Sequence, residues 1–176
     1  YLGGPYRSPD VTRWNLRSWK TAPKGSGFPM SYGYLWMKLY RKAFLDRHKL
    51  RFREEFYSKA DVIFHWRSMS LAERVSVVPE PLYHYRVHEN SITGTIGKRF
   101  IQVIDVMEAI KADLLELDDP KGLLPAWYPF AANFIYGAYQ QLAPEYRPEM
   151  RDALRSFLSR LDDDERRVIT RSEEHT

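Results

Sequence analysis

Residues 60–78 read ADVIFHWRSMSLAERVSVV, and this stretch decides the predicted fold. Its first half places apolar side chains on one face at helical spacing, so we expect a helix from Asp61 to residues 73–74, capped by Ser58 or Asp61. The apolar positions of this face are Val62, Ile63, Trp66 and Met69. Its second half is a β-branched run, and residues 82–86 resume as a strand after two prolines. Strands on both sides of a helix predict an α/β layer.

The flanking residues extend this pattern in both directions. Residues 30–40 are rich in β-forming aromatic and apolar residues and predict the first strand, followed by a short helix over residues 41–49 and extended chain over residues 50–52. Residues 1–30 combine Gly, Pro, Ser and basic residues without a period and predict a loop. Residues 97–169 predict a helical region of three helices: an apolar stripe from Phe100 to Leu117, a helix beginning near Pro125, and one with Pro148 in its first turn.

Composition narrows the possible functions of the 176 residues. The chain has no Cys, which excludes a disulfide framework and a thiol nucleophile. Residues 1–55 carry twelve Lys or Arg against four acidic residues, a net +8, whereas residues 101–176 carry nine against fifteen, a net −6. A basic first third indicates an anionic partner: a nucleotide-sugar diphosphate, a phosphate-rich acceptor, a membrane surface or a nucleic acid. The longest apolar run, residues 123–138, is too short to cross a bilayer.

Three blocks of sequence carry a family resemblance. They are YLWMKLY at residues 34–40, DVIFHW at residues 61–66 and YRVHENSIT at residues 85–93. In this order and spacing they resemble the acceptor-side, C-terminal half of inverting bacterial family-2 glycosyltransferases of the GT-A type. The resemblance implies half of a GT-A fold at residues 31–95, preceded by the basic loop-rich segment of residues 1–30 and followed by an α-helical extension at residues 97–169. The nucleotide-binding half would then lie upstream, and the present chain would be an inactive fragment. Residues 171–176 read as a non-native tail.

The same resemblance implies what the intact enzyme does. It transfers a sugar with inversion from a nucleotide-sugar donor to a cell-envelope or capsular glycan, or a lipid-linked acceptor, with Mg²⁺ or Mn²⁺ as cofactor. It works in the cytoplasm, at or near the inner face of the membrane. The main metal ligands are expected in the upstream half.

Asp61 is the predicted catalytic residue. A general base must be a carboxylate close to the acceptor hydroxyl, and a carboxylate at a helix N-terminus is favoured by the helix dipole. In the family that the chain resembles, the second member of an acidic pair at this place is the base. The first member is replaced here by Ala60, which puts acceptor positioning in doubt. The alternative is that Asp61 only caps its helix.

Predicted substrate contacts follow from the other two blocks. The resemblance assigns Arg86, His88 and Ser91 to a loop over the donor diphosphate, where a guanidinium and a hydroxyl suit phosphate oxygens. His88 is also a tentative metal ligand. Lys38 is a candidate contact to a phosphate or an acidic acceptor, with a plain surface lysine as the alternative. Trp36, in the same block, is expected in the core rather than on a sugar platform.

A non-catalytic binding module and a nucleic-acid-binding protein are the two alternatives to a glycosyltransferase. The replacements at Ala60 and at Met37 would also fit a non-catalytic glycosyltransferase-like module that binds a partner or the membrane surface. Nucleic-acid binding has no supporting motif, and we expect none. The acidic run Asp162-Asp163-Asp164 fits a D-x-D metal pattern, but we interpret it as a solvated acidic cap.

Overall fold

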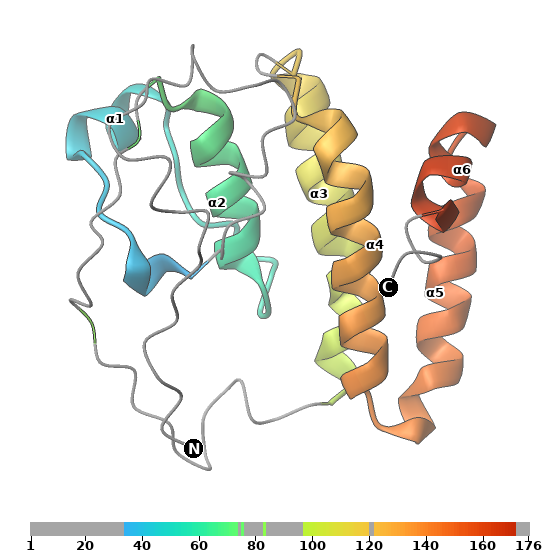
Figure 1. Ribbon diagram of the computed structural model, residues 1–176. Coiled ribbons are helices and arrows are strands. Elements are labelled where there is room, and N and C mark those ends of the chain that lie inside the picture. Colours follow the sequence, from blue (N-terminus) through green and yellow to red (C-terminus); the bar gives the residue numbers. More distant parts are fainter. Residues whose placement is uncertain (1–33, 74, 76–82, 84–96, 120–121, 172–176) are drawn as a thin grey trace.

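The structure is a computed structural model, and it describes residues 34–73, 75, 83, 97–119 and 122–171. Figure 1 shows a helical layer in which α2, α3, α4 and α5 run roughly side by side. The turn η3 and the short α1 are the first elements of the described chain and lie on the α2 side of this layer. The helices are α1 (Lys42–Arg47), α2 (Ala60–Leu71), α3 (Val103–Glu116), α4 (Leu124–Gln141), α5 (Arg147–Ser159) and α6 (Asp163–Arg171). The short 3-10 helices are η3 (Leu35–Met37), η5 (Lys98–Gln102) and η6 (Pro144–Tyr146).

The predicted α/β, half GT-A fold is wrong for the residues that the structure describes, because none of them forms a strand. The strand expected over residues 30–40 is replaced, from Tyr34 onward, by the turn η3 and irregular chain, and residues 50–52 pair with no neighbour. Val75 and Tyr83 are not in strands, while most of the two other expected strands lies outside the described residues. The β-forming residues misled the prediction because strand propensity depends on pairing and burial, and Tyr34, Trp36 and Leu39 are exposed here.

The helix expected from Asp61 is confirmed as α2, and burial explains its stability. Eight of its twelve residues are buried, among them Trp66 and Met69 of the predicted apolar face. The helix ends where the Ala72 N–H donates to the carbonyl of Ser68 and the backbone turns extended. A helix buried on nearly all sides needs cover from several elements, and α2 receives most of it from α3.

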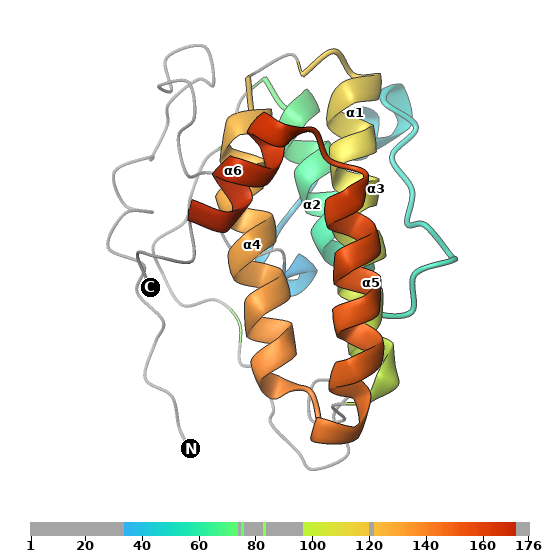
Figure 2. The ribbon, with the colours of Figure 1, turned by 90° about the vertical axis from the view of Figure 1, so that its right-hand side faces the viewer.

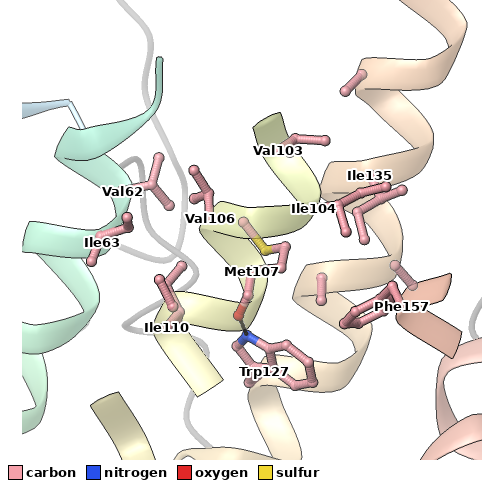
Figure 3. Close-up of a cluster of buried hydrophobic side chains, with 14 of the residues drawn as sticks. Val62, Ile63, Val103, Ile104, Val106, Met107, Ile110, Trp127, Ile135 and Phe157 are labelled. Carbon is pink, nitrogen blue, oxygen red and sulfur yellow. Dashed lines mark hydrogen bonds between the residues drawn. The ribbon is translucent and has the colours of Figure 1, made fainter. Parts of the chain in front are cut away.

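The core lies where α3 meets α2, α4 and α5 (Figure 3). Val62 and Ile63 of α2 face Val106 and Ile110 of α3. On the other side of α3, the fully buried indole of Trp127 donates its Nε1–H to the Met107 carbonyl at 3.1 Å. The bond satisfies the one polar atom of a large buried ring, so Trp127 fixes the height of α4 against α3.

The three C-terminal helices expected from the sequence are present, and a fourth, α6, was not expected. The helices α4 and α5 run in opposite directions and are joined by η6; α5 packs against α3, and α6 folds back across α4 (Figure 2). Pro148 lies in the first turn of α5, as predicted. Asp162 and Glu165 cap α6 reciprocally: the Glu165 N–H donates to Asp162 Oδ1 at 2.8 Å and the Asp162 N–H to Glu165 Oε2 at 3.1 Å. The acidic run therefore starts a helix instead of ending one.

A buried carboxylate ties the segment before α2 to the helical layer. Asp113 of α3 keeps 3% of its side chain exposed, and its Oδ1 accepts hydrogen bonds from Arg53 and, at 2.7 Å, from Arg67 of α2. Arg67 also reaches Glu116 at 3.3 Å. Burial raises the pKa of Asp113, and the two guanidiniums work against that rise. The contact ties Arg53, in the segment before α2, and Arg67 of α2 to α3.

None of the helices in the described ranges combines the length and the hydropathy that crossing a bilayer requires. The boundaries proposed at residues 30, 95 and 170 stay predictions, since no observation of the structure tests them.

Candidate functional site

Asp61 lies in the first turn of α2, where the helix presents its unpaired N–H groups. The helix begins at Ala60, and Lys59 precedes it in a left-handed conformation (φ 64°) without a side-chain cap. The Oδ1 atom of Asp61 accepts a hydrogen bond from the Val62 N–H at 3.0 Å. Its side chain is only partly buried. A negative charge at this position is stabilised by the helix dipole.

Lys38 is the second predicted site residue that the structure places here. It follows η3, and its Nζ donates to the Tyr34 carbonyl at 3.0 Å. Burial lowers the pKa of Lys38 to about 8, against the attraction of the Asp61 carboxylate, which raises it. Lys38 and Asp61 are 23 positions apart in the sequence, but in the folded chain the charge of each one shifts the pKa of the other.

The surroundings of Asp61 make its carboxylate more basic. Burial raises its pKa, and this effect outweighs the opposing influence of Lys59, of the Val62 N–H and of Lys38. The ammonium of Lys59 is itself held over the rings of Phe100 and Phe134, at 5.3 and 5.5 Å from their centroids. A carboxylate with a raised pKa accepts a proton more readily than an ordinary one, which is the property that a general base needs.

Tyr40 joins this group, although sequence reasoning assigned it no chemistry. Burial raises the pKa of its hydroxyl, and the Asp61 charge raises it further, against the influence of Ser68. Its ring packs edge-on against Phe64 at 5.3 Å. Within the described residues its buried hydroxyl makes no hydrogen bond that meets normal geometry, since the Ser68 hydroxyl donates to the His65 carbonyl. Tyr40 joins the candidate site only because the folded chain brings it within range of the Asp61 charge. In the sequence it is one tyrosine in an aromatic run, and nothing there marks it as a site residue.

Exposed aromatic rings stack beside the segment that carries Lys38. Tyr34 stacks on Trp36 with centroids 5.2 Å apart, and Trp36 stacks on Tyr83 at 4.8 Å. The core position expected for Trp36 is wrong, because 38% of the residue is exposed. The turn η3 contributes no buried residue, so it turns its rings to the surface instead of the core.

The remaining predicted contacts cannot be placed beside this group. Arg86, His88 and Ser91 lie outside the described residues, so their roles at a donor diphosphate stay predictions. Ala60, which stands where the resemblance expects an acid, is the first residue of α2 and adds no charge to the site. A surface hollow of about 510 Å³ lies elsewhere, lined by Tyr57, Lys98, Arg99, Ile101, Gln102, Asp105 and Glu149, and contains none of the predicted residues.

The described part of the chain offers no fit for a divalent cation. Over these ranges no three His, Asp or Glu side chains come together as ligands. The acidic run at the start of α6 is engaged in helix capping and in exposed ion pairs with Arg166 and Arg167. A metal ion therefore has no assigned role in the chemistry derived from these residues.

Comparison with known proteins gives two partial matches. The chain is 39% identical over 72 residues to a "Putative glycosyltransferase EpsH" of Bacillus subtilis (strain 168), which covers 40% of this chain and 21% of that protein. It is 38% identical over 60 residues to an "Uncharacterized glycosyltransferase EpsJ" of the same organism, covering 34% of this chain and 17% of the relative. No family profile and no solved structure matches the sequence. Over about a fifth of their length, then, two proteins named glycosyltransferases are similar to this chain.

Proposed function

We propose that this chain is the acceptor-side part of an inverting, family-2 glycosyltransferase that extends a cell-envelope or capsular glycan in the cytoplasm. The observation that carries the proposal is the partly buried carboxylate of Asp61 in the first turn of α2, which accepts a hydrogen bond from the Val62 N–H and whose pKa burial raises against the influence of the Lys38 charge. The partial similarity to two proteins named glycosyltransferases supports the same class of reaction. Donor sugar, acceptor and linkage are open to experiment.

In the proposed step Asp61 acts as the general base. Its carboxylate takes the proton of an acceptor hydroxyl while that oxygen forms a bond to the anomeric carbon of the donor sugar. The bond from that carbon to the phosphate oxygen breaks at the same time, and the nucleoside diphosphate leaves with the electron pair. The attack comes from the face opposite the leaving group, so the configuration inverts. The proton remains on Asp61 until water removes it.

Lys38 supplies positive charge beside the reacting groups. With a pKa of about 8 it is mostly protonated at neutral pH, so it attracts a phosphate or an acidic acceptor and keeps Asp61 ionised before the reaction. Arg86, His88 and Ser91 keep their proposed contacts to the departing diphosphate. Mg²⁺ or Mn²⁺ remains the proposed cofactor of the whole enzyme and would stabilise charge on that diphosphate. The described residues hold no site for it, and no step above depends on it.

The test compares two isosteric replacements in the protein expressed from its complete gene. Asp61→Asn removes the base but keeps size and helix-end hydrogen bonding, so release of nucleoside diphosphate from a panel of nucleotide sugars should fall by about 10²- to 10⁴-fold. Asp46→Asn is the matched control, because Asp46 lies exposed on α1 and bonds only to surface cations. Equal activity of Asp61→Asn and the control would remove Asp61 from the mechanism.

A non-catalytic module remains the second candidate, and one observation favours it. Ala60 begins α2 where an acidic residue would complete the expected pair, so the head of the helix has one carboxylate instead of two. Such a module would bind a protein partner or an anionic membrane without turnover. Sedimentation with anionic and neutral vesicles tests the membrane form of this reading, which fails if the chain stays in the supernatant with both.

A further inference from the structure

The surface hollow of about 510 Å³ lies where three helical elements meet the segment before α2. Four of the five residues of η5 line it, together with Asp105 of α3, Glu149 of α5 and Tyr57. Its volume falls within the range of ligand sites, about 300–1,000 Å³. The hollow contains none of the residues that the sequence assigned to chemistry, so the proposed reaction leaves its lining without a role.

Tyr57 supplies a free aromatic face at this hollow. The residue is 85% exposed, and within the described ranges its side chain makes no ring contact and no hydrogen bond. A tyrosine in this state adds little to the stability of the fold. Both the apolar face of its ring and its hydroxyl are therefore available to a ligand.

The lining also carries charges of both signs. Lys98 and Glu149 form an exposed ion pair across η5 and α5 at 3.0 Å. Arg99 and Asp105 line the same hollow, but in the described part of the chain neither side chain makes an ion pair or a hydrogen bond. Two cations and two anions leave the lining with no net charge, so it does not favour an anion or a cation as its ligand.

Gln102 connects the hollow to the segment that leads into α2. Its Oε1 accepts a hydrogen bond from the Ser58 N–H at 3.3 Å, and its Nε2 donates to the Glu55 carbonyl at 3.1 Å. Each end of this amide keeps one further hydrogen-bonding position. Tyr57 precedes Asp61 by four residues, so their Cα atoms are at most about 14 Å apart, the reach of a fully extended chain of that length. A chain-like ligand that ends at Asp61 can therefore extend into the hollow.

We propose that this hollow binds a neutral sugar unit of the acceptor glycan, away from the hydroxyl that reacts. The proposal rests on the proposed function. The negative face of the Tyr57 ring attracts the polarised C–H groups on one face of a pyranose. Each sugar hydroxyl both donates and accepts hydrogen bonds, and the lining offers donors on Arg99 and acceptors on Asp105.

The same lining argues against two other kinds of ligand. A diphosphate needs an excess of positive charge, which the balanced set of charged side chains does not provide. An amphipathic helix of a protein partner needs an apolar groove, and Ile101 is the one aliphatic side chain among the described lining residues. A neutral, hydroxyl-rich ligand with one apolar face fits both the ring and the charges.

The test measures binding without turnover, on the protein expressed from its complete gene. Isothermal titration calorimetry uses cellotetraose, mannotetraose and chitotetraose, with pyrophosphate as the anionic probe. Tyr57→Ala should weaken binding of at least one oligosaccharide by about 2- to 12-fold, the range expected for losing one aromatic contact. Tyr57→Phe retains the ring and should stay within about twofold. Asp105→Asn loses the charge and one acceptor oxygen, and should weaken the same oligosaccharide by about 2- to 12-fold.

Tyr136→Ala is the matched control, because Tyr136 is an exposed tyrosine of α4 that does not line the hollow. Circular dichroism of Tyr57→Ala and Asp105→Asn should match that of the unmodified protein, since both side chains are exposed. Equal affinities of Tyr57→Ala and Tyr136→Ala would overturn the site, as would the absence of binding by all three oligosaccharides at millimolar concentration. Pyrophosphate binding that is tighter than any oligosaccharide binding and is weakened by Arg99→Gln would assign the hollow to an anion and also overturn it.

Failure of this site and failure of the proposed general base are separate outcomes. Asp61 does not line the hollow, so Asp61→Asn should leave oligosaccharide affinity nearly unchanged. The turnover assay of Asp61→Asn decides the base, whereas the binding of oligosaccharides to Tyr57→Ala decides the hollow.

Discussion

Replacing Asp113 with alanine should lower the free energy of unfolding by about 2–3 kcal/mol. Removing one partner of a buried ion pair costs about 3–5 kcal/mol, because the remaining charge is left without a partner. Arg53 and Arg67 keep 33% and 25% of their side chains exposed, so water recovers part of that loss and the expected cost falls at or just below the lower end of that range. Urea unfolding at neutral pH, followed by the fluorescence of buried Trp66 and Trp127, measures the change.

Asp113→Asn separates the hydrogen bonds from the charge. Burial raises the pKa of Asp113, so ionising this carboxyl does not favour the folded state, and the neutral amide, which keeps one acceptor oxygen, should cost only about 1 kcal/mol. Asp152→Ala is the control: its side chain is 73% exposed and pairs with Arg155 on the surface of α5, so its loss should cost less than about 0.5 kcal/mol. If the amide proves as costly as alanine, or alanine no more costly than the control, the reasoning is refuted.

Three further outcomes follow from the geometry. If the cation of Lys38 takes part in turnover, kcat/KM should fall as pH rises through about 8, and Lys38→Arg, which stays charged, should shift that alkaline limb to higher pH in a pH–rate profile. Burial works to raise the pKa of Glu165, but hydrogen bonds from Lys111 and Tyr128 hold this pKa below its ordinary value. The ionised Glu165 therefore stabilises the folded state above the ordinary carboxyl pKa, and this stabilisation is lost as pH falls through the folded-state pKa. Glu165→Gln should therefore expose α6 to faster tryptic cleavage at neutral pH. In acid, urea unfolding should give nearly the same free energy of unfolding for Glu165→Gln and for the unmodified chain. Trp127→Phe should cost about 2–3 kcal/mol in urea unfolding, from the lost hydrogen bond to α3 and the cavity left by the smaller ring; a change under about 0.5 kcal/mol would contradict the role assigned to this indole.

Helices were predictable from the sequence where a single periodic stripe meets the core. The apolar spacing that begins at Val62 and the stripe from Phe100 onward give α2 and α3, and Pro148 marks the start of α5. These signals are local, since each helix makes its own backbone hydrogen bonds. The strand predicted over residues 30–40 is absent from residue 34 onward, because a strand exists only with a partner, which no local pattern contains.

Two residues of the candidate site, Asp61 and Lys38, were named from the sequence, but their arrangement was not, and the roles of all the predicted site residues stay predictions. Asp61 could be named from its place at a helix start, and Lys38 from its block, but their mutual influence depends on the folded arrangement of the chain. Tyr40 and the row of rings around Trp36 escaped prediction because exposure and stacking are properties of the folded chain. The helix α6 was missed because an acidic run reads equally as the end or the beginning of a helix, and only the capping bonds of Asp162 decide.

The two segments that carry Asp61 and Lys38 differ in how much substitution their sequences tolerate. Asp61 stands on α2, eight of whose twelve residues are buried, so most changes near the base also weaken the fold. The turn η3 has no fully buried residue, so changes there should cost less stability than changes in α2. A library of substitutions restricted to residues 35–37 would therefore vary the surface that precedes Lys38 while α2 and the position of Asp61 stay in place.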